Sequence, residues 1–297
     1  MKNRTPNDTW LVTGAGGLLG GDLVRAWHEW PVVGLRHAEL DITESDACRR
    51  VLDEHRPAAV VNCAAHASLD FCETHRDEAM RVNADGPRRL AEACAAAGAR
   101  LVHISTDYVF DGEKGEPYVE DDEPRPLSVY SESKLAGERA VLEVSGSFLV
   151  VRVAWVFGFA EKSFPRTVLR RAQHMPTVRV IADQLGSPTY SLDIAEAIAR
   201  LVEVDVAGIV HFTNEGVCTR FDMARHIFTR LGLGTGRVQA MASSTLPWVA
   251  PRPARLELSK ERYRQATSAH VRPWHEALDE YLEADAACAA LARAASG

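Results

Sequence analysis

The residues that decide the fold stand near the N-terminus: Trp10-Leu11-Val12-Thr13-Gly14-Ala15-Gly16-Gly17-Leu18-Leu19-Gly20. Four strand-forming residues lead into three glycines spaced G-x-x-G-x-x-G, and a helical pattern follows. Glycine allows both the tight turn and the close approach of backbone amides to a pyrophosphate at the positive end of a helix. We therefore expect Gly14, Gly17 and Gly20, with Leu18 and Leu19, to bind a dinucleotide cofactor, although a tight strand-to-helix turn without a ligand can use glycines too.

Outward from this stretch, apolar strands alternate with helices through the first half of the chain. Strands are expected at 10–13, 32–35, 58–62 and 101–105, and helices at 18–29, at 43–55 and over a long alanine-rich run ending at Gly98. Thr43 and Asp46 are spaced like a capping box at the start of the second helix. The alternation predicts βαβ units with right-handed crossovers, and hence a Rossmann-like, doubly wound parallel sheet of the α/β class.

The end of the second strand indicates which dinucleotide binds. Leu35-Arg36-His37 places an arginine where NAD sites usually carry an acid for the ribose 2′-hydroxyl. An arginine suits the 2′-phosphate of NADP, so we expect Arg36 to favour NADPH, with NADH as the alternative cofactor; a solvated surface arginine would look the same in sequence. The nearby Asp41 is close enough to serve as such an acid and so weakens the case for NADPH, although Asp41 and Ile42 could equally flank the adenine.

Tyr130 and Lys134 are four residues apart in a segment that resumes a helical pattern near Ser128, so they share one helix face. Ser105 and Thr106 end the fourth strand upstream. A phenol can donate the proton that a ketone needs during hydride addition, and a neighbouring ammonium lowers its ordinary pKa of about 10. We expect the Thr106 hydroxyl to polarise the carbonyl, although an ordinary exposed Tyr–Lys pair has the same spacing.

The second half of the chain is less regular. An exposed loop is expected at 112–126, because this segment holds glycine, proline and many acids. Strands are expected at 148–152 and 209–212, and helices at 163–174, 191–203 and 219–231. No linker separates two units. We expect residues 1–160 to form the NADP-binding domain, with a returning segment at about 178–213, and residues 161–297 to form mainly a smaller, interleaved substrate-binding lobe.

Composition limits the partners and the compartment. The chain has 297 residues and a net charge of -7 without a basic stripe, which disfavours nucleic acid. No apolar run is long enough to span a membrane or to form a signal-peptide core, so a cytoplasmic protein is expected. The six cysteines show no C-x-x-C pair and the histidines no metal-ligand spacing, so we expect reduced, mostly buried thiols and no structural metal site.

Several motifs, spread over nearly the whole chain, resemble the dTDP-4-dehydrorhamnose reductase family of the extended short-chain dehydrogenase/reductase superfamily. The S-T-D-Y-V-F and D-Q-x-G-x-P-T segments are the most specific, whereas the glycine motif is common to the superfamily. The matching stretches are 12–20, 61–66 with Asp70 and Glu73, 105–110, 129–138, 152–155, 183–189 and Arg252-Pro253.

The resemblance implies NADPH-dependent reduction of a 4-keto nucleotide deoxysugar, with Thr106, Tyr130 and Lys134 as catalytic residues. It implies that Tyr108 and Trp155 contact the sugar, although Trp155 could be a plain core aromatic. Arg252, in the proline-rich loop 247–253, is our candidate for the substrate's diphosphate. The implied cofactor-side positions are Asn62, Cys63, Ala64, Ala65, Asn83, Ser105, Tyr130 and Lys134, with Asn83 alternatively a structural amide inside a helix.

Two departures from the family leave points open. Ala67 stands where the family often has threonine, which affects the identity of the sugar. Asp22 stands where some members carry a glutamate linked to a metal-bridged dimer, which leaves Mg²⁺ and the choice between monomer and homodimer undecided. Two alternative functions share the motifs: a non-catalytic NADP-binding regulatory subunit of a methionine adenosyltransferase, and a nucleotide-sugar epimerase.

Overall fold

The computed structural model describes residues 9–285, and its larger part is built on one six-stranded sheet. The strand order is β10-β5-β4-β3-β1-β2, and every neighbouring pair is parallel, so the expected doubly wound α/β sheet is confirmed. The strands are β1 Trp10–Thr13, β2 Val32–Leu35, β3 Ala59–Asn62, β4 Arg100–Thr106, β5 Leu149–Val153 and β10 Gly208–His211.

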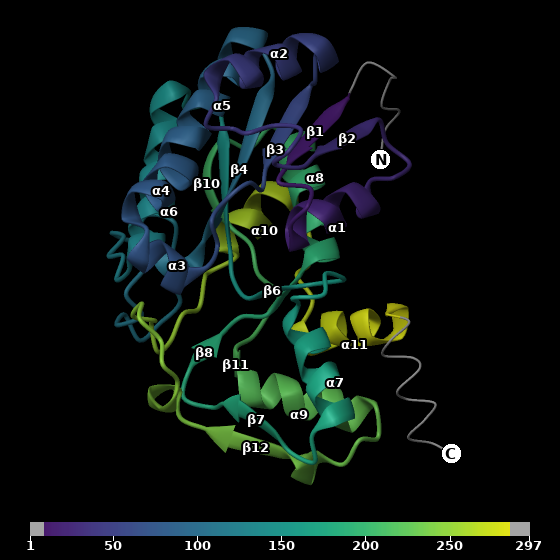
Figure 1. Ribbon diagram of the computed structural model, residues 1–297. Coiled ribbons are helices and arrows are strands. Elements are labelled where there is room, and N and C mark those ends of the chain that lie inside the picture. The colour runs from purple at the N-terminus through teal and green to yellow at the C-terminus, as the bar shows by residue number, and fades with distance from the viewer. Residues whose placement is uncertain (1–8, 286–297) are drawn as a thin grey trace.

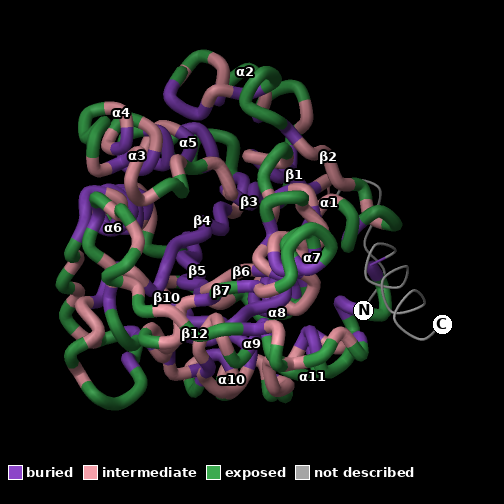
Figure 2. The backbone as a smooth tube through the Cα atoms, turned by 60° about the horizontal axis from the view of Figure 1, so that its bottom comes forward, coloured by how far each residue is buried: buried purple, intermediate pink, exposed green. Residues whose placement is uncertain are grey.

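Helices cover both faces of this sheet (Figure 1). Side chains of a strand alternate between the two faces, so Trp10 and Val12 pack with Leu23 of α1 and Ile194 of α8, whereas Leu11 packs on the opposite face with α2, α5 and α6. Burial is accordingly concentrated along the central strands and the inner sides of the helices (Figure 2). These helices are α1 Leu18–Ala26, α2 Ser45–His55, α5 Gly86–Ala97, α6 Val129–Val144, α8 Ser191–Glu203 and α10 Glu261–Thr267.

Of two sequence-based details of the first half, one is confirmed and one is wrong. The alanine-rich helix leading to Gly98 is present: α4 Arg76–Met80, a π-helical turn Arg81–Asp85 and α5 follow one another without a break in the helical backbone, and the non-helical His75 separates α4 from the short α3 Leu69–Thr74. Gly98 does end α5, with φ at 68°. Thr43 and Asp46 form no capping box, because the Thr43 hydroxyl and N–H both donate to Asp41 Oδ1 and α2 begins after Glu44.

The smaller part has its own apolar core and a two-stranded parallel sheet made by β7 Val178–Ile181 and β12 Val238–Met241. Because β7 pairs there, the chain returns to the large sheet with α8 and β10 rather than from about residue 178. The remaining elements are β6 Val156–Phe157, α7 Phe164–His174, β8 Leu185–Gly186, β9 Thr189–Tyr190, β11 Cys218–Thr219, α9 Arg220–Arg230, α11 Trp274–Ala284 and three 3₁₀ turns at Asp107–Val109, Thr235–Arg237 and Ser243–Thr245.

The structure also bears on the expectations for loop 112–126, for the cysteines and for membrane-spanning helices. Loop 112–126 is not wholly exposed: Tyr118 is buried and stacks on Phe110 with ring centroids 4.2 Å apart. Cys48, Cys72, Cys94 and Cys218 are free and buried and Cys63 is free and partly buried, as expected, whereas Cys288 lies outside the described residues. Within residues 9–285, no helix combines the length and the hydropathy needed to cross a membrane.

Candidate active site

The glycine turn opens into a cavity of about 720 Å³ at the carboxyl ends of the sheet strands. Gly14 has φ at +68°, and a Cβ there would lie 2.6 Å from the backbone N of Ala64. A Cβ at Gly20 would lie 2.4 Å from Gly14 O, so only glycine fits at either position. Gly17 and Gly20 line the cavity with Leu18 and Leu19, and the N-terminal amides of α1 therefore face a space where a pyrophosphate can bind.

The adenine-side candidates lie beyond this cavity. Arg36 is exposed at the end of β2, and its Cγ is 3.7 Å from where a Cβ on Gly16 would stand. Its guanidinium is thus accessible beside the glycine turn. Asp41 Oδ1 accepts the N–H and the hydroxyl of Thr43, and the buried Ile42 packs against Gly86 at the start of α5.

Asn62 and Asn83 hold the loop after β3 instead of facing the cavity. Asn62 Oδ1 accepts the Thr13 hydroxyl at 2.7 Å, and its Nδ2 lies 3.0 Å from His103 Nδ1. Asn83 Oδ1 accepts the N–H of His66, and its Nδ2 donates to His66 O and to Ser133 Oγ. Protein groups thus bind both amides, and a cofactor-side role for these two positions stays a prediction.

The backbone of that loop nevertheless lines the cavity. Cys63, Ala65 and Ala67 all contribute to its wall, whereas Ala64 packs against Gly14. Ser105 at the end of β4 also lines it, and the buried Ser105 hydroxyl has no hydrogen-bond partner among residues 9–285. A buried hydroxyl without a partner in the protein is suited to a bound ligand.

Thr106, Tyr130 and Lys134 meet in this same cavity. Thr106 is the last residue of β4, and Tyr130 and Lys134 lie on one face of α6. The start of α6 is held in place because Ser128 caps it and Glu73 accepts the N–H of Val129 at 3.0 Å. Lys134 is buried, and its Nζ donates to Ile104 O at 2.7 Å. The structure thus brings the three expected residues together.

Burial sets the protonation of this pair. Desolvation raises the pKa of Tyr130 above its usual value, while the Thr106 hydroxyl opposes the shift. Desolvation lowers the pKa of Lys134 to about 8, and the carboxylate of Glu138, one turn along α6, opposes that shift. Tyr130 therefore keeps its proton at neutral pH, as a proton donor must.

Asp107 and Arg220 also line the cavity; Asp107 lies within the S-T-D-Y-V-F segment but was not among the expected site residues, and no sequence pattern singled out Arg220. Asp107 is 2% exposed, and burial raises its pKa to about 7. Arg220 begins α9, and its guanidinium carbon lies 3.9 Å from the centroid of the Trp155 ring and 4.8 Å from that of Phe164. One buried Arg220 nitrogen, Nη1, has no partner within the described chain.

A second cavity, of about 460 Å³, adjoins the first and shares Tyr108, Trp155 and Arg220 with it. The described residues that line it include no Asp or Glu. Its cations are Lys162, Arg171, Arg179, Arg220 and Arg252, and its large aromatics are Tyr108, Trp155, Phe164 and Trp248. In a chain of net charge -7, a hollow with cations and no acids selects an anion.

Arg252 contributes to this cavity differently from our expectation. Its Nη2 lies 3.0 Å from Asp70 Oδ2, and its guanidinium carbon lies 3.9 Å from the Trp248 ring centroid. It is thus already paired with an acid of α3. Arg171, Arg179 and Arg220, which form no ion pair within residues 9–285, are better placed to receive a phosphate.

Trp155 lines both cavities and is not a plain core aromatic. Its φ is 41°, in the left-handed region that non-glycine residues seldom adopt. The indole packs against Gly186, where a Cβ would come within 2.4 Å of the ring. This packing explains the glycine of the D-Q-L-G-S-P-T segment.

Asp22 lies inside the protein. It is 4% exposed, and its Oδ2 accepts the N–H of Phe159 at 3.0 Å and the hydroxyl of Ser191 at 2.6 Å. It therefore joins α1 to the smaller part. Within the described range, no group of three or more His, Cys, Asp or Glu side chains could hold a metal ion.

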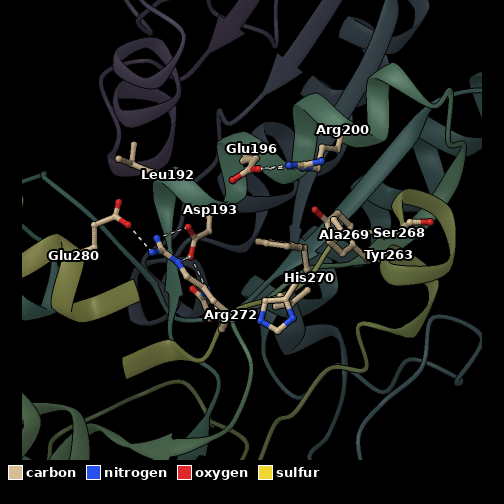
Figure 3. A pocket seen from close by; sticks show the side chains of 13 residues that line it. Leu192, Asp193, Glu196, Arg200, Tyr263, Ser268, Ala269, His270, Arg272 and Glu280 are labelled. Atoms are coloured by element: carbon tan, nitrogen blue, oxygen red, sulfur yellow. Dashed lines mark hydrogen bonds and ion pairs between the residues drawn. The ribbon is translucent and has the colours of Figure 1, made fainter. Parts of the chain in front are cut away.

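A further cavity, of about 600 Å³, lies beside α8, and Thr106, Tyr130 and Lys134 are not among the residues that line it (Figure 3). Its charged side chains are largely paired with one another: Arg272 with Asp193 and Glu280, and Arg200 with Glu196. It lacks the excess of cations found in the second cavity.

Comparison with known proteins agrees with the geometry. Residues 9–287 match the family described as the RmlD substrate binding domain. The dTDP-4-dehydrorhamnose reductase of Mycobacterium tuberculosis is 42% identical over 284 residues, 93% of each chain. The dTDP-4-keto-6-deoxy-D-glucose reductase of Streptomyces niveus is 40% identical over 277 residues, 92% of this chain and 96% of that protein.

A solved structure extends the likeness to the fold. The crystal structure of dTDP-4-dehydrorhamnose reductase from Bacillus anthracis in complex with NADP superposes with a TM-score of 0.90 at 32% identity, covering 94% of this chain and 99% of that one. The chain therefore belongs to the RmlD substrate binding domain family, that of the dTDP-4-dehydrorhamnose reductases within the extended short-chain dehydrogenase/reductase superfamily.

Proposed function

We propose that the protein uses NADPH to reduce the C4 ketone of a dTDP-linked deoxysugar to a hydroxyl. The observation that carries the proposal is the meeting of Thr106, Tyr130 and Lys134 in a cavity that joins the glycine turn to a cationic, aromatic-lined hollow. The relatives named as reductases of dTDP-4-keto sugars support the same reaction class.

The cavity suits a nicotinamide dinucleotide. The glycine turn leaves room for a pyrophosphate where any Cβ at Gly14 or Gly20 would clash with backbone. The Ser105 hydroxyl has no hydrogen-bond partner in the described part of the chain, and Arg36 is accessible for a 2′-phosphate. The NADP complex of the Bacillus anthracis relative supports the phosphorylated cofactor.

The second cavity suits the nucleoside diphosphate of the substrate. Arginine forks match phosphate oxygens, and we assign Arg171, Arg179 and Arg220 to that role. Tyr108 and Trp155 lie where the two cavities meet, so the sugar between the diphosphate and Tyr130 contacts both.

The residues then divide the chemistry. A bound nicotinamide supplies the hydride. Negative charge develops on the ketone oxygen, and Tyr130 donates its proton there while Thr106 donates a hydrogen bond. Lys134 uses one of its three N–H donors on Ile104 O, which leaves two for the cofactor ribose and for stabilising the Tyr130 phenolate.

The test is a panel of dTDP-4-keto-6-deoxysugars with NADPH, followed by the absorbance of the reduced cofactor. We expect one NADPH oxidised per ketone reduced. Tyr130→Phe should lower kcat by about a hundredfold or more while NADPH binding persists. Tyr190→Phe is the matched control, because it removes a phenol hydroxyl that has no hydrogen-bond partner among residues 9–285 and lies in the core of the smaller part.

Other outcomes would contradict the proposal. Conversion of a sugar without net NADPH oxidation would indicate an epimerase. NADP binding without turnover of any ketone, and with Tyr130→Phe indistinguishable from wild type, would indicate the regulatory-subunit alternative.

A further inference from the structure

The Thr106 hydroxyl carries one hydrogen, and the structure offers it two destinations. Thr106 Oγ1 lies 3.2 Å from Asp107 Oδ1, and it accepts the N–H of Tyr108, also at 3.2 Å. The same hydroxyl lines the cavity beside Tyr130, where the ketone oxygen must lie to receive a proton. A Thr106 hydrogen donated to an Asp107 carboxylate is not available to the ketone.

The surroundings of Asp107 oppose a negative charge. Its Oδ2 is buried and has no hydrogen-bond partner among the described residues, and no ion pair within residues 9–285 includes this carboxyl group. Arg220 from α9 is the cation that acts on it, and the tyrosines that face it are Tyr108 and Tyr130. An unpaired buried carboxylate costs more than the neutral acid, consistent with a pKa that burial raises to about 7.

We propose that Asp107 is a positioning residue for the reduction: as a neutral acid it donates its hydrogen to Thr106 Oγ1, so that the Thr106 hydrogen is free for the ketone oxygen. This inference rests on the proposed ketoreductase function. Asp107 acts only through Thr106 and exchanges no proton with the substrate.

The two lone pairs of Thr106 Oγ1 give this arrangement a second effect. Thr106 Oγ1 can accept two hydrogen bonds, and the Tyr108 N–H and the Asp107 hydroxyl use both. Thr106 then cannot accept the hydrogen of Tyr130, so both hydroxyls donate to the ketone. Ionised Asp107 reverses this: Thr106 turns its hydrogen to Oδ1 and offers Tyr130 a competing acceptor.

The pH profile tests the protonation state. Because the neutral form is required, kcat should fall as pH rises through about 7, before Lys134, with a pKa of about 8, loses its proton. Asp107→Asn puts a permanent N–H donor at the same position and should move this alkaline limb up by about one pH unit. A limb that stays in place in Asp107→Asn would overturn the proposal.

A double-mutant cycle tests whether Asp107 acts through Thr106. Asp107→Leu has similar size and no donor, and it should lower kcat about tenfold or more with unchanged NADPH affinity. In a Thr106→Val background the same change should cost less than about twofold, since the hydroxyl it orients is gone. Equal losses in both backgrounds would show a merely structural role and overturn the proposal.

The Asp107→Asn variant and the wild-type activity separate failure of this inference from misfolding and from failure of the proposed function. If Asp107→Leu does not fold, the nearly isosteric Asp107→Asn profile decides alone. A wild-type protein that reduces no ketone in the panel contradicts the proposed function and removes this inference with it, whereas an active enzyme with an unmoved Asp107→Asn profile contradicts only the inference.

Discussion

Asp70 and Arg252 form a bidentate ion pair, in which Arg252 Nη2 lies 3.0 Å from Asp70 Oδ2 and Arg252 Nη1 lies 3.2 Å from Asp70 Oδ1. Asp70 Oδ1 also accepts the N–H groups of Val249 and Ala250, each at 3.0 Å. One carboxylate of α3 thus holds the proline-rich loop against the larger part of the molecule. Trp248 of this loop lines the cationic cavity, so the ion pair sets the shape of that wall.

Asp70→Ala should loosen the loop and raise KM for the nucleotide sugar about fivefold, with the Kd for NADPH unchanged. Steady-state kinetics with each substrate varied in turn would measure this. Glu196→Ala is the control, because it breaks an ion pair beside the distant cavity of Figure 3. An unchanged sugar KM in Asp70→Ala would show that the loop keeps its shape without this carboxylate.

The ion pair should persist at neutral pH. The Arg252 hydrogen bond lowers the pKa of Asp70 below 3.8, the loop amides add to that effect, and partial burial opposes it. A carboxyl group whose folded-state pKa is lowered contributes stability above its unfolded pKa and loses it as pH falls. The sugar KM should therefore gain no contribution from Asp70 protonation between pH 6 and 9.

Arg220→Met should weaken binding of the substrate's diphosphate. The change removes a guanidinium with a buried, unpartnered Nη1 while keeping an unbranched side chain against Trp155 and Phe164. Competitive inhibition by dTDP should weaken about tenfold or more, whereas inhibition by thymidine should not change. Arg139→Met, on the exposed side of α6, is the control. Equal loss for thymidine and dTDP would assign Arg220 to shaping the pocket alone.

Arg36→Ala should reduce the preference for NADPH. Only NADPH carries the 2′-phosphate, so its Kd should rise about tenfold while the Kd for NADH stays nearly constant. NADH is thus the internal control. Fluorescence titration of both cofactors measures the effect, and a preference that survives the substitution would move the 2′-phosphate away from Arg36.

Gly186→Ala should displace the indole of Trp155, because the new Cβ would meet the ring at 2.4 Å. We expect the sugar kcat/KM to fall about tenfold or more, with NADPH affinity retained. Gly146→Ala is a matched control, since a Cβ there meets nothing within 4 Å. Normal kcat/KM in a folded Gly186→Ala protein would show that the sugar does not depend on the position of Trp155.

Short-range patterns carried most of what could be predicted. The glycine spacing 14–17–20 and the pair Tyr130–Lys134 involve neighbours along one turn or one helix face, where backbone geometry allows few arrangements. The strand-helix alternation likewise left one sheet class to choose, because crossovers between parallel strands have a single hand. By contrast, no local pattern marked the break at His75 between α3 and α4, and the capping spacing of Thr43 was overridden by the hydrogen bonds that Asp41 Oδ1 accepts from Thr43.

By itself, the sequence determined the sheet, the glycine turn and the helix that carries Tyr130 and Lys134, since each depends on contacts between residues close along the chain. Only the tertiary structure decided which side chains face the cavities. The side chains of Asn62 and Asn83 hydrogen-bond to buried polar groups of distant segments, which require partners inside the protein. Arg252 pairs with Asp70, which lies on a helix far away in sequence. Arg220 reached Trp155 and Asp107 became buried for the same reason: packing between distant segments, which no local spacing records, fixes both burial and partner.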